Sequence, residues 1–340
     1  MIELLGSISA FILSSWLTRR FCDPASRWHI LDHPNERSLH TQPTPRSGGI
    51  AIVGGLVAGG VINWVAGHEA LAQLWLLVAA LPVATVSFLD DRGGVPVSLR
   101  FAVHMVGAAV LVWGAGLAFK GEFFSVFGVE WPSWAGALFA LVYIVWMINL
   151  YNFMDGMDGF AGGMAVVGFG TFAVLGGISG HGPFTLLSLV VAASTGGFLL
   201  FNFPPARIFM GDVGSSVLGL LAAALSLWGT RDGVFPFWVA VLVFSPFIVD
   251  ATVTLLRRFF RGERVWLPHK THYYQRLVQL GWGHRKTVLY EYGLMAACSA
   301  SALLAVRLGT AGQRLMVLAW CGVYLVLIAA VTWLEKKEAH

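Results

Sequence analysis

The chain has 340 residues, of which 57% are hydrophobic and 12% are charged. That charged fraction is about half that of a typical soluble domain, so the composition excludes an ordinary soluble protein and indicates a polytopic membrane protein. The 40 glycines and 14 tryptophans are typical of closely packed spanning helices with aromatic anchors at the membrane interfaces. The formal net charge of +4 says less than the placement of the basic residues along the chain.

Apolar runs long enough to cross a bilayer, about 20 residues each, recur along the whole chain. The first run ends in Arg19-Arg20 without a small-residue cleavage site, so we expect a retained anchor and no cleaved signal peptide. No fixed-period repeat and no linker divides the sequence, which predicts one all-α transmembrane domain over residues 1–340. We expect about eleven spans, at 2–18, 48–67, 71–89, 99–119, 132–152, 160–179, 183–203, 214–230, 234–255, 288–306 and 313–334.

Lysine and arginine are distributed unevenly among the predicted loops. If the N-terminus is outside, 18 of the 22 basic residues lie in inner loops, and the exceptions are Lys120, Arg231, Arg307 and Arg314. Because basic residues favour the cytosolic side, we expect an outer N-terminus and a cytosolic C-terminus. The loops predicted to form the cytosolic face are about 20–47, 90–98, 153–159, 204–213 and 256–287.

Six aspartates fall at the predicted inner ends of spans. Ionisable groups near a bilayer are costly and need a reason. Carboxylates gathered at one face repel one another unless a cation neutralises them, and oxygen ligands of this kind suit Mg²⁺ or Mn²⁺. The six are Asp90, Asp91, Asp155, Asp158, Asp212 and Asp250.

Asp90 and Asp91 close the third predicted span. Two acids at a helix C-terminus oppose the helix dipole, which favours a binding function over a solvated helix end. Arg100, at the start of the next span, is a candidate partner for a phosphate.

The segment 149–163 contains two Asp-Gly steps three residues apart, beginning at Asp155 and Asp158. Asp-Gly alone is an ordinary turn signal, but here the turn also offers carboxylates and free backbone N–H groups. Asn149 and Asn152, at the end of an apolar helix, favour a ligand site over a simple turn.

The segment 209–215 reads Phe-Met-Gly-Asp-Val-Gly-Ser and leads from two prolines into the next span. Asp212 and Ser215 could be helix N-caps. Alternatively, Asp212 binds a metal ion while the small residues let a phosphate approach the backbone N–H groups of a helix N-terminus.

The fourth motif is a basic inner loop with the spacing His269-Lys-Thr-His272. Such a loop can be a topology signal or a contact with anionic lipids. The alternative is a phosphate site, which the basic surroundings favour over zinc because no third ligand is adjacent.

Taken in order, and with Pro43-Thr-Pro-Arg46-Ser-Gly-Gly in the first inner loop, these motifs resemble the polyprenyl-phosphate N-acetylhexosamine-1-phosphate transferases of glycosyltransferase family 4, which include the MraY and WecA types. The resemblance covers nearly the whole chain. It implies that Asp212 is a Mg²⁺ ligand and that Asp90 and Asp91 lie at the reacting phosphates. The residues that it places around the nucleotide and the metal are Asn152, Asp155, Asp158 and Phe209.

The resemblance further implies transfer of a HexNAc-1-phosphate from a UDP-HexNAc to undecaprenyl phosphate, with release of UMP. No nucleic-acid partner is expected, and a homodimer stays open. A phosphate monoester is already mostly ionised at neutral pH, so we expect Asp90 and Asp91 to hold metal or align the lipid phosphate rather than to act as a base. The expected catalytic residues are Asp90, Asp91, Asp212, His269 and His272, and the expected substrate-binding residues are Arg46, Arg100, Asn149, Asn152, Asp155, Asp158, Phe209 and Arg276.

The fourth motif departs from the MraY type, which carries three consecutive histidines there. This favours an enzyme that starts O-antigen or related surface polysaccharides over a phospho-MurNAc-pentapeptide transferase. Tyr273, Tyr274, Gln275 and Arg276 are candidate contacts for the sugar. An ion-coupled transporter would place its acids near the bilayer midplane, and an intramembrane aspartyl protease would need an Asp pair inside the membrane, so acids at one face disfavour both classes.

Overall fold

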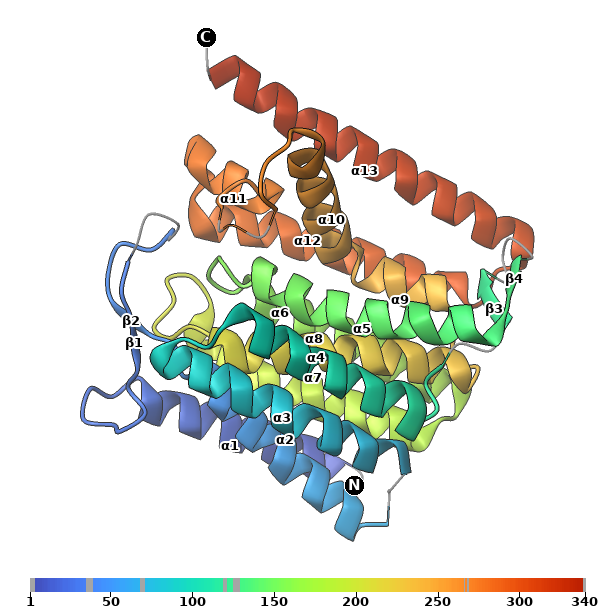
Figure 1. The fold of residues 1–340 in the computed structure, drawn as a ribbon, viewed down its shortest axis with the longest axis horizontal. Helices are drawn as coiled ribbons and strands as arrows, with labels where there is room; N and C mark the ends of the chain where they lie inside the picture. Colours follow the sequence, from blue (N-terminus) through green and yellow to red (C-terminus); the bar gives the residue numbers. More distant parts are fainter. Residues whose placement is uncertain are drawn as a thin grey trace.

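The structure, a computed structural model, describes residues 4–34, 39–67, 71–118, 121–124, 129–265, 267 and 269–338. Within these residues the chain consists of long helices packed side by side and two short β-hairpins (Figure 1). The helices are α1 (Leu5–Phe21), α2 (Gly48–Val65), α3 (Leu71–Gly93), α4 (Val97–Ala109), α5 (Ser133–Met154), α6 (Phe160–Ser179), α7 (Gly182–Asn202), α8 (Gly211–Arg231), α9 (Phe237–Val243), α10 (Ser245–Phe260), α11 (Tyr273–Leu277), α12 (Gly283–Ala305) and α13 (Thr310–Glu338).

Both hairpins are antiparallel, and they lie at opposite ends of the helical body (Figure 1). The first pairs β1 (Leu31–Asp32) with β2 (Thr44–Pro45), and the second pairs β3 (Gly121–Phe124) with β4 (Val129–Trp131). Two π-helical segments, Val110–Gly114 and Val278–Trp282, continue α4 and α11.

The predicted polytopic helical membrane fold is confirmed in its coarse form. Of the described helices, nine are long and apolar enough to cross a membrane, or up to ten if α9 and α10 form one broken span. The helix α1, with 17 described residues, is not among them. The total of about eleven spans therefore stays a prediction.

The predicted span at 234–255 is broken into two helices in the structure. The helices α9 and α10 meet at Phe244 with an angle of 81° between them. Pro246 stands in the first turn of α10, and because proline has no N–H and clashes with the preceding turn, it ends the helix before it.

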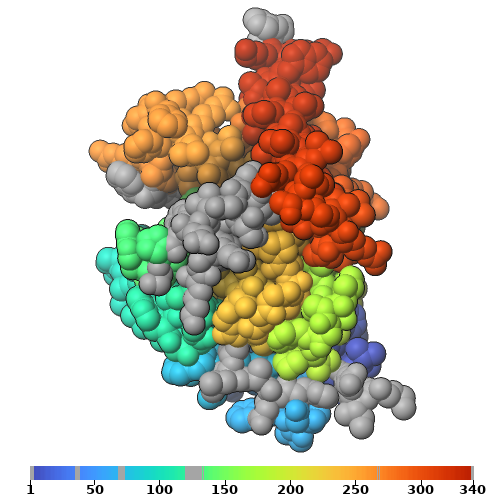
Figure 2. All heavy atoms as spheres, turned by 90° about the vertical axis from the view of Figure 1, so that its right-hand side faces the viewer, coloured from blue at the N-terminus to red at the C-terminus, as the bar shows by residue number. Residues whose placement is uncertain are grey.

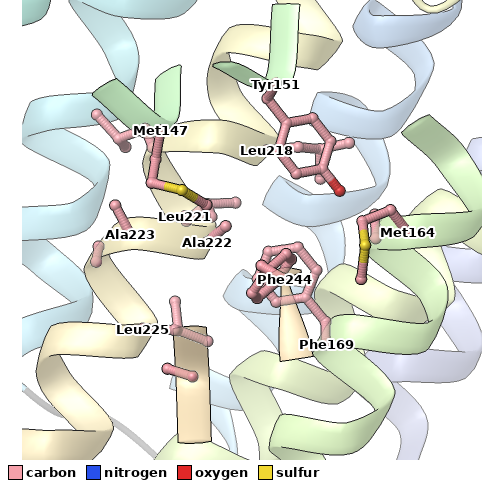
Figure 3. Close-up of a cluster of buried hydrophobic side chains, with 14 of the residues drawn as sticks. Met147, Tyr151, Met164, Phe169, Leu218, Leu221, Ala222, Ala223, Leu225 and Phe244 are labelled. Atoms are coloured by element: carbon pink, nitrogen blue, oxygen red, sulfur yellow. The ribbon is translucent and has the colours of Figure 1, made fainter. Parts of the chain in front are cut away.

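The helix α8 lies at the centre of the molecule, and 94% of the residues in its apolar stretch are buried. The helices α5, α3 and α2 pack along it. Close approach to α5 depends on Gly219, where a Cβ atom would come within 2.5 Å of the Met147 carbonyl oxygen. Small residues at such crossings are how spanning helices achieve dense packing. Figure 3 shows Leu218, Leu221, Ala222 and Leu225 of α8 facing Met147, Tyr151, Met164, Phe169 and Phe244.

The C-terminal helix α13 lies on the outside of this body, as Figure 2 shows. No residue in the apolar stretch of this helix is buried. Large side chains such as Leu315 and Leu325 are more than two-thirds exposed, at 69% and 68%. Such a face suits contact with lipid.

Candidate active site

The turn before α8 is fixed by main-chain hydrogen bonds to the first hairpin. Phe209 N donates to Pro45 O over 2.7 Å, and Gly48 N and Gly49 N donate to the carbonyls of Phe209 and Met210 over 3.0 and 2.7 Å. Gly211 has φ of +71°, and a Cβ there would overlap the Arg46 carbonyl. Only glycine suits this close crossing, which sets the position of the next residue, Asp212.

The N-terminus of α8 is capped by a carboxylate from α3. Asp91 is buried, and its Oδ1 and Oδ2 accept from Asp212 N and Val213 N, both over 3.2 Å. A negative group at this helix end is favoured by the free N–H groups and by the helix dipole. Arg46 also donates to the Asp91 backbone carbonyl, so the first loop, α3 and α8 are joined at one point.

Asp212 is held between two helices. Asn152 of α5 donates through Nδ2 to Oδ1 of Asp212 over 2.8 Å. Arg100 of α4 lies 3.3 Å from Oδ2 of Asp212 and also pairs with Asp90. The backbone N–H of Val95 donates to Asp90 over 2.6 Å. Charged hydrogen bonds of this type orient the carboxylates into one cluster.

The two Asp-Gly turns lie beside this cluster. Burial raises the pKa of Asp155 well above its usual value, and the nearby charges of Asp212 and Asp91 raise it further. The raised pKa means that the ionised form of Asp155 is unfavourable here, first because it is buried and then because two other carboxylates are near.

Asp158 faces the other side of the same turn. Its Oδ2 accepts from Ala206 N over 3.0 Å, and its Oδ1 lies 3.0 Å from Nδ1 of His284. Asn202 connects the same two segments, accepting from Gly159 N over 2.9 Å and donating to Ile208 O over 2.8 Å.

The loop after α10 brings the histidines to the cluster. Asp250 accepts from the backbone N–H groups of Tyr273 and Tyr274 over 2.9 and 3.0 Å and lies 3.2 Å from Nδ1 of His272. A proton on Nδ1 shared with Asp250 leaves Nε2 of His272 for a ligand. The ring of His269 lies 4.8 Å from that of His272.

These segments enclose one cavity of about 660 Å³. It collects eleven of the residues singled out in the sequence: Asp90, Asp91, Asp155, Asp158, Asp212, Arg46, Arg100, Asn152, Phe209, His269 and His272. They come from segments up to 226 positions apart in the chain, from Arg46 to His272.

Two residues expected to bind substrate lie elsewhere. The side chain of Asn149 turns back onto its own helix and donates to Val145 O over 2.7 Å. Arg276 faces away from the cavity because its guanidinium pairs with Glu335 of α13. Of the four residues expected to contact the sugar, Tyr274 and Gln275 line the cavity, while Tyr273 and Arg276 do not.

The cavity also contains residues that the sequence did not single out as site residues, among them Asp32, His40 and His284. Asp32 lies 3.5 Å from Nη1 of Arg46 and 3.6 Å from Nε2 of His40, and the ring of His40 packs on Phe209 at 4.8 Å. The hairpin that carries Asp32 has only two residues per strand, too few for a periodic signal, and His284 stands in a segment with no motif around it.

Several known proteins resemble this chain over most of its length. A model of the glycosyl transferase family 4 matches residues 73–230. The chain is 33% identical to a probable undecaprenyl-phosphate N-acetylglucosaminyl 1-phosphate transferase of Bacillus subtilis, covering 91% of this chain and 86% of that protein. It is 32% identical to a decaprenyl-phosphate N-acetylglucosaminephosphotransferase of Mycobacterium tuberculosis, with coverage of 88% and 82%. A phospho-N-acetylmuramoyl-pentapeptide-transferase of Chlorobium phaeobacteroides is 25% identical, with coverage of 87% and 88%.

The chain thus combines a helical membrane body with a carboxylate-rich cavity at one end of its central helix. The chain belongs to glycosyl transferase family 4, and the N-acetylglucosamine-phosphate transferases named above are more similar to it than the pentapeptide transferase.

Removal of the Asp91 cap should reduce stability. We expect Asp91→Ala to lower the free energy of unfolding by roughly 1–2 kcal/mol, because two buried N–H groups at the start of α8 lose their acceptor. Thermal unfolding in detergent, followed by intrinsic fluorescence, measures the change. Asp155→Ala is the matched control, since it removes one carboxylate from the same cavity but no described hydrogen bond of that side chain. An Asp91→Ala variant as stable as Asp155→Ala would contradict the capping role.

Proposed function

We propose that this chain transfers a HexNAc-1-phosphate from a UDP-HexNAc, UDP-GlcNAc or a related UDP-N-acetyl sugar, to undecaprenyl phosphate, with release of UMP. The observation that carries the proposal is that all four sequence motifs meet in one cavity. Relatives that cover most of the chain are named for N-acetylglucosamine-phosphate transfer to polyprenyl phosphates. We further propose that the product starts a surface polysaccharide such as O-antigen; the lower identity to the pentapeptide transferase disfavours the peptidoglycan alternative.

The charge balance of the cavity supports a metal requirement. Its acidic side chains outnumber its two arginines by four, and they are Asp32, Asp90, Asp91, Asp155, Asp158 and Asp212. The pyrophosphate of a UDP-sugar brings more negative charge, so a cation must offset the repulsion before the nucleotide can bind.

Mg²⁺ is suited to bind the carboxylates of the cavity together with the phosphates of the substrate. Among the described residues, no three His, Cys, Asp or Glu side chains are arranged to hold an ion by themselves. Mg²⁺ commonly takes one or two carboxylates, waters and substrate phosphates, and Asp212, with Asp155 beside it, would hold it. Bound there, Mg²⁺ would neutralise charge on the pyrophosphate; Mn²⁺ has similar oxygen preferences.

The chain's own residues would align the two substrates. Catalysis of phosphoryl transfer depends mainly on positioning and charge stabilisation. Arg100, which already bridges Asp90 and Asp212, is placed to donate to phosphate oxygens. Nε2 of His272 can donate to them when both ring nitrogens carry a proton. Phe209 offers the face of an aromatic ring to the nucleobase. In the reaction an oxygen of undecaprenyl phosphate attacks the β-phosphorus of the UDP-sugar, the bond from that phosphorus to the bridging oxygen breaks, and UMP leaves.

Asp91 and Asp90 have roles other than general base in this proposal. The carboxylate of Asp91 accepts two backbone N–H groups, and that of Asp90 accepts from Arg100 and Val95. The attacking phosphate needs no base, because its second pKa is about 6 and it is therefore mostly ionised at neutral pH. Asp90 therefore orients Arg100, and Asp91 orients the turn that carries Asp212.

The reaction is tested by UMP release from UDP-GlcNAc, undecaprenyl phosphate and Mg²⁺ with the purified protein. We expect Asp212→Asn to lose at least about 90% of the turnover, because an anionic metal ligand contributes several kcal/mol to such a transition state. The exposed Asp23→Asn is the control and should keep its activity. Release of UMP by Asp212→Asn at the wild-type rate would exclude the assigned role, and no release by wild-type protein from any UDP-HexNAc would exclude the reaction.

We also propose that the cavity opens to the cytosol of a bacterial cell, with the N-terminus outside, because most Lys and Arg residues lie in the loops at its end of the molecule. In a variant without native cysteines, Cys at the exposed Ser98 should react with an impermeant maleimide only in inside-out vesicles. Cys at Gly309, between α12 and α13, should react only in right-side-out vesicles. The reverse pattern would invert the orientation.

A further inference from the structure

A second cavity, of about 300 Å³, lies beside the active-site cavity and shares no lining residue with it. The short helix α11 contributes to both: Tyr274 and Gln275 to the active-site cavity, and Arg276 to the second. The second cavity is lined by Thr254, Arg257, Arg258, Arg261, Glu263, Lys270, Thr271, Arg276, Gln279, Leu280 and Glu335. With five basic and two acidic side chains it has three excess positive charges, opposite in sign to its neighbour.

Part of this positive charge is neutralised within the protein. Arg258 pairs with Glu263 over 2.9 Å and also donates to two backbone carbonyls of the loop. Arg276 pairs with both carboxylate oxygens of Glu335 and packs over the Tyr273 ring at 4.5 Å. These pairs hold the walls of the cavity in place.

The remaining donors have no hydrogen-bonded partner within the described part of the chain, although Arg257 and Arg261 attract Glu335 electrostatically. The side chains of Arg257, Arg261 and Lys270 make no hydrogen bond or ion pair with described residues. The side chain of Arg276 is only 8% exposed, and its buried Nη1 group has no hydrogen-bond acceptor. A buried charged donor without an acceptor is costly, so the cavity is suited to an anion.

The helix α10, which contributes Arg257, Arg258 and Arg261 to the cavity, also exposes three large apolar side chains. Leu256, Phe259 and Phe260 are 49%, 64% and 80% exposed, and Phe260 stands one helical turn from Arg257. An inorganic anion would use only the arginines. A ligand with an anionic head and hydrocarbon chains would use both parts of this surface.

We propose that this cavity binds the headgroup of an anionic phospholipid and that Leu256, Phe259 and Phe260 contact its acyl chains. Clusters of basic residues at the end of spanning helices bind such headgroups through their positive charge. The ligand is separate from the transferase substrates, because the catalytic residues lie in the other cavity.

The test titrates the full-length protein in neutral detergent with short-chain phosphatidylglycerol, measured by thermophoresis, and repeats it with phosphatidylcholine of the same chain length. We expect Arg257→Gln/Arg261→Gln to weaken phosphatidylglycerol binding about 25-fold, since each cation near an anionic lipid surface is worth about fivefold. Arg19→Gln/Arg20→Gln removes the same two charges from exposed positions at the end of α1 and should bind like wild type. Glu335→Gln frees Arg276 and should bind about fivefold more tightly.

Four results would overturn the proposal. Equal binding of the two phospholipids would show that the headgroup charge is not recognised. Full displacement of phosphatidylglycerol by millimolar inorganic phosphate would make the ligand a soluble anion. An Arg257→Gln/Arg261→Gln variant that keeps wild-type affinity for phosphatidylglycerol would show that the lipid does not bind in this cavity. A variant whose main defect is a raised KM for undecaprenyl phosphate would show that the cavity binds the substrate instead. Thermal unfolding of each variant confirms that it is folded.

Discussion

The contact between the Asp91 carboxylate and the first N–H groups of α8 is the interaction on which the site depends. It joins the end of α3 to the start of the most buried helix, and the first hairpin is bonded to the same turn from the other side. One negative charge at a helix N-terminus is favourable. Because the Asp91 carboxylate caps the N-terminus of α8, the side chain of Asp212 is left to project toward Asn152 and Arg100.

The other carboxylates of the cavity outnumber its basic side chains, although Asp90 and Asp158 also accept backbone N–H groups. Burial first, and then the charges of Asp212 and Asp91, raise the pKa of Asp155, so a further negative charge is unfavourable there. A metal ion brought in with the nucleotide would offset this charge. Across α11 the second cavity has the opposite sign, so a five-residue helix separates a region suited to a metal-bound nucleotide from one suited to an anionic lipid.

The sequence was sufficient to predict which residues gather in the cavity, because most of its motifs stand at helix ends. Asp90, Asp155 and Asp212 each follow or begin a long apolar run, and antiparallel helices of equal length bring such ends together. Arg276 was misplaced because the orientation of a five-residue helix depends on Glu335, which lies 59 positions further along the chain. His40 was missed as a site residue because its place depends on a two-residue strand pairing rather than on periodicity.

Because acidic side chains outnumber basic ones in its lining, we propose that the cavity binds a nucleotide only together with a divalent cation. Isothermal titration of the purified wild-type protein with UDP-GlcNAc, in Mg²⁺ and again in EDTA, measures this dependence. Two like charges about 4 Å apart repel by several kcal/mol at a partly buried site, so removal of the cation should weaken binding at least about tenfold. Equal affinity in Mg²⁺ and in EDTA would contradict the claim.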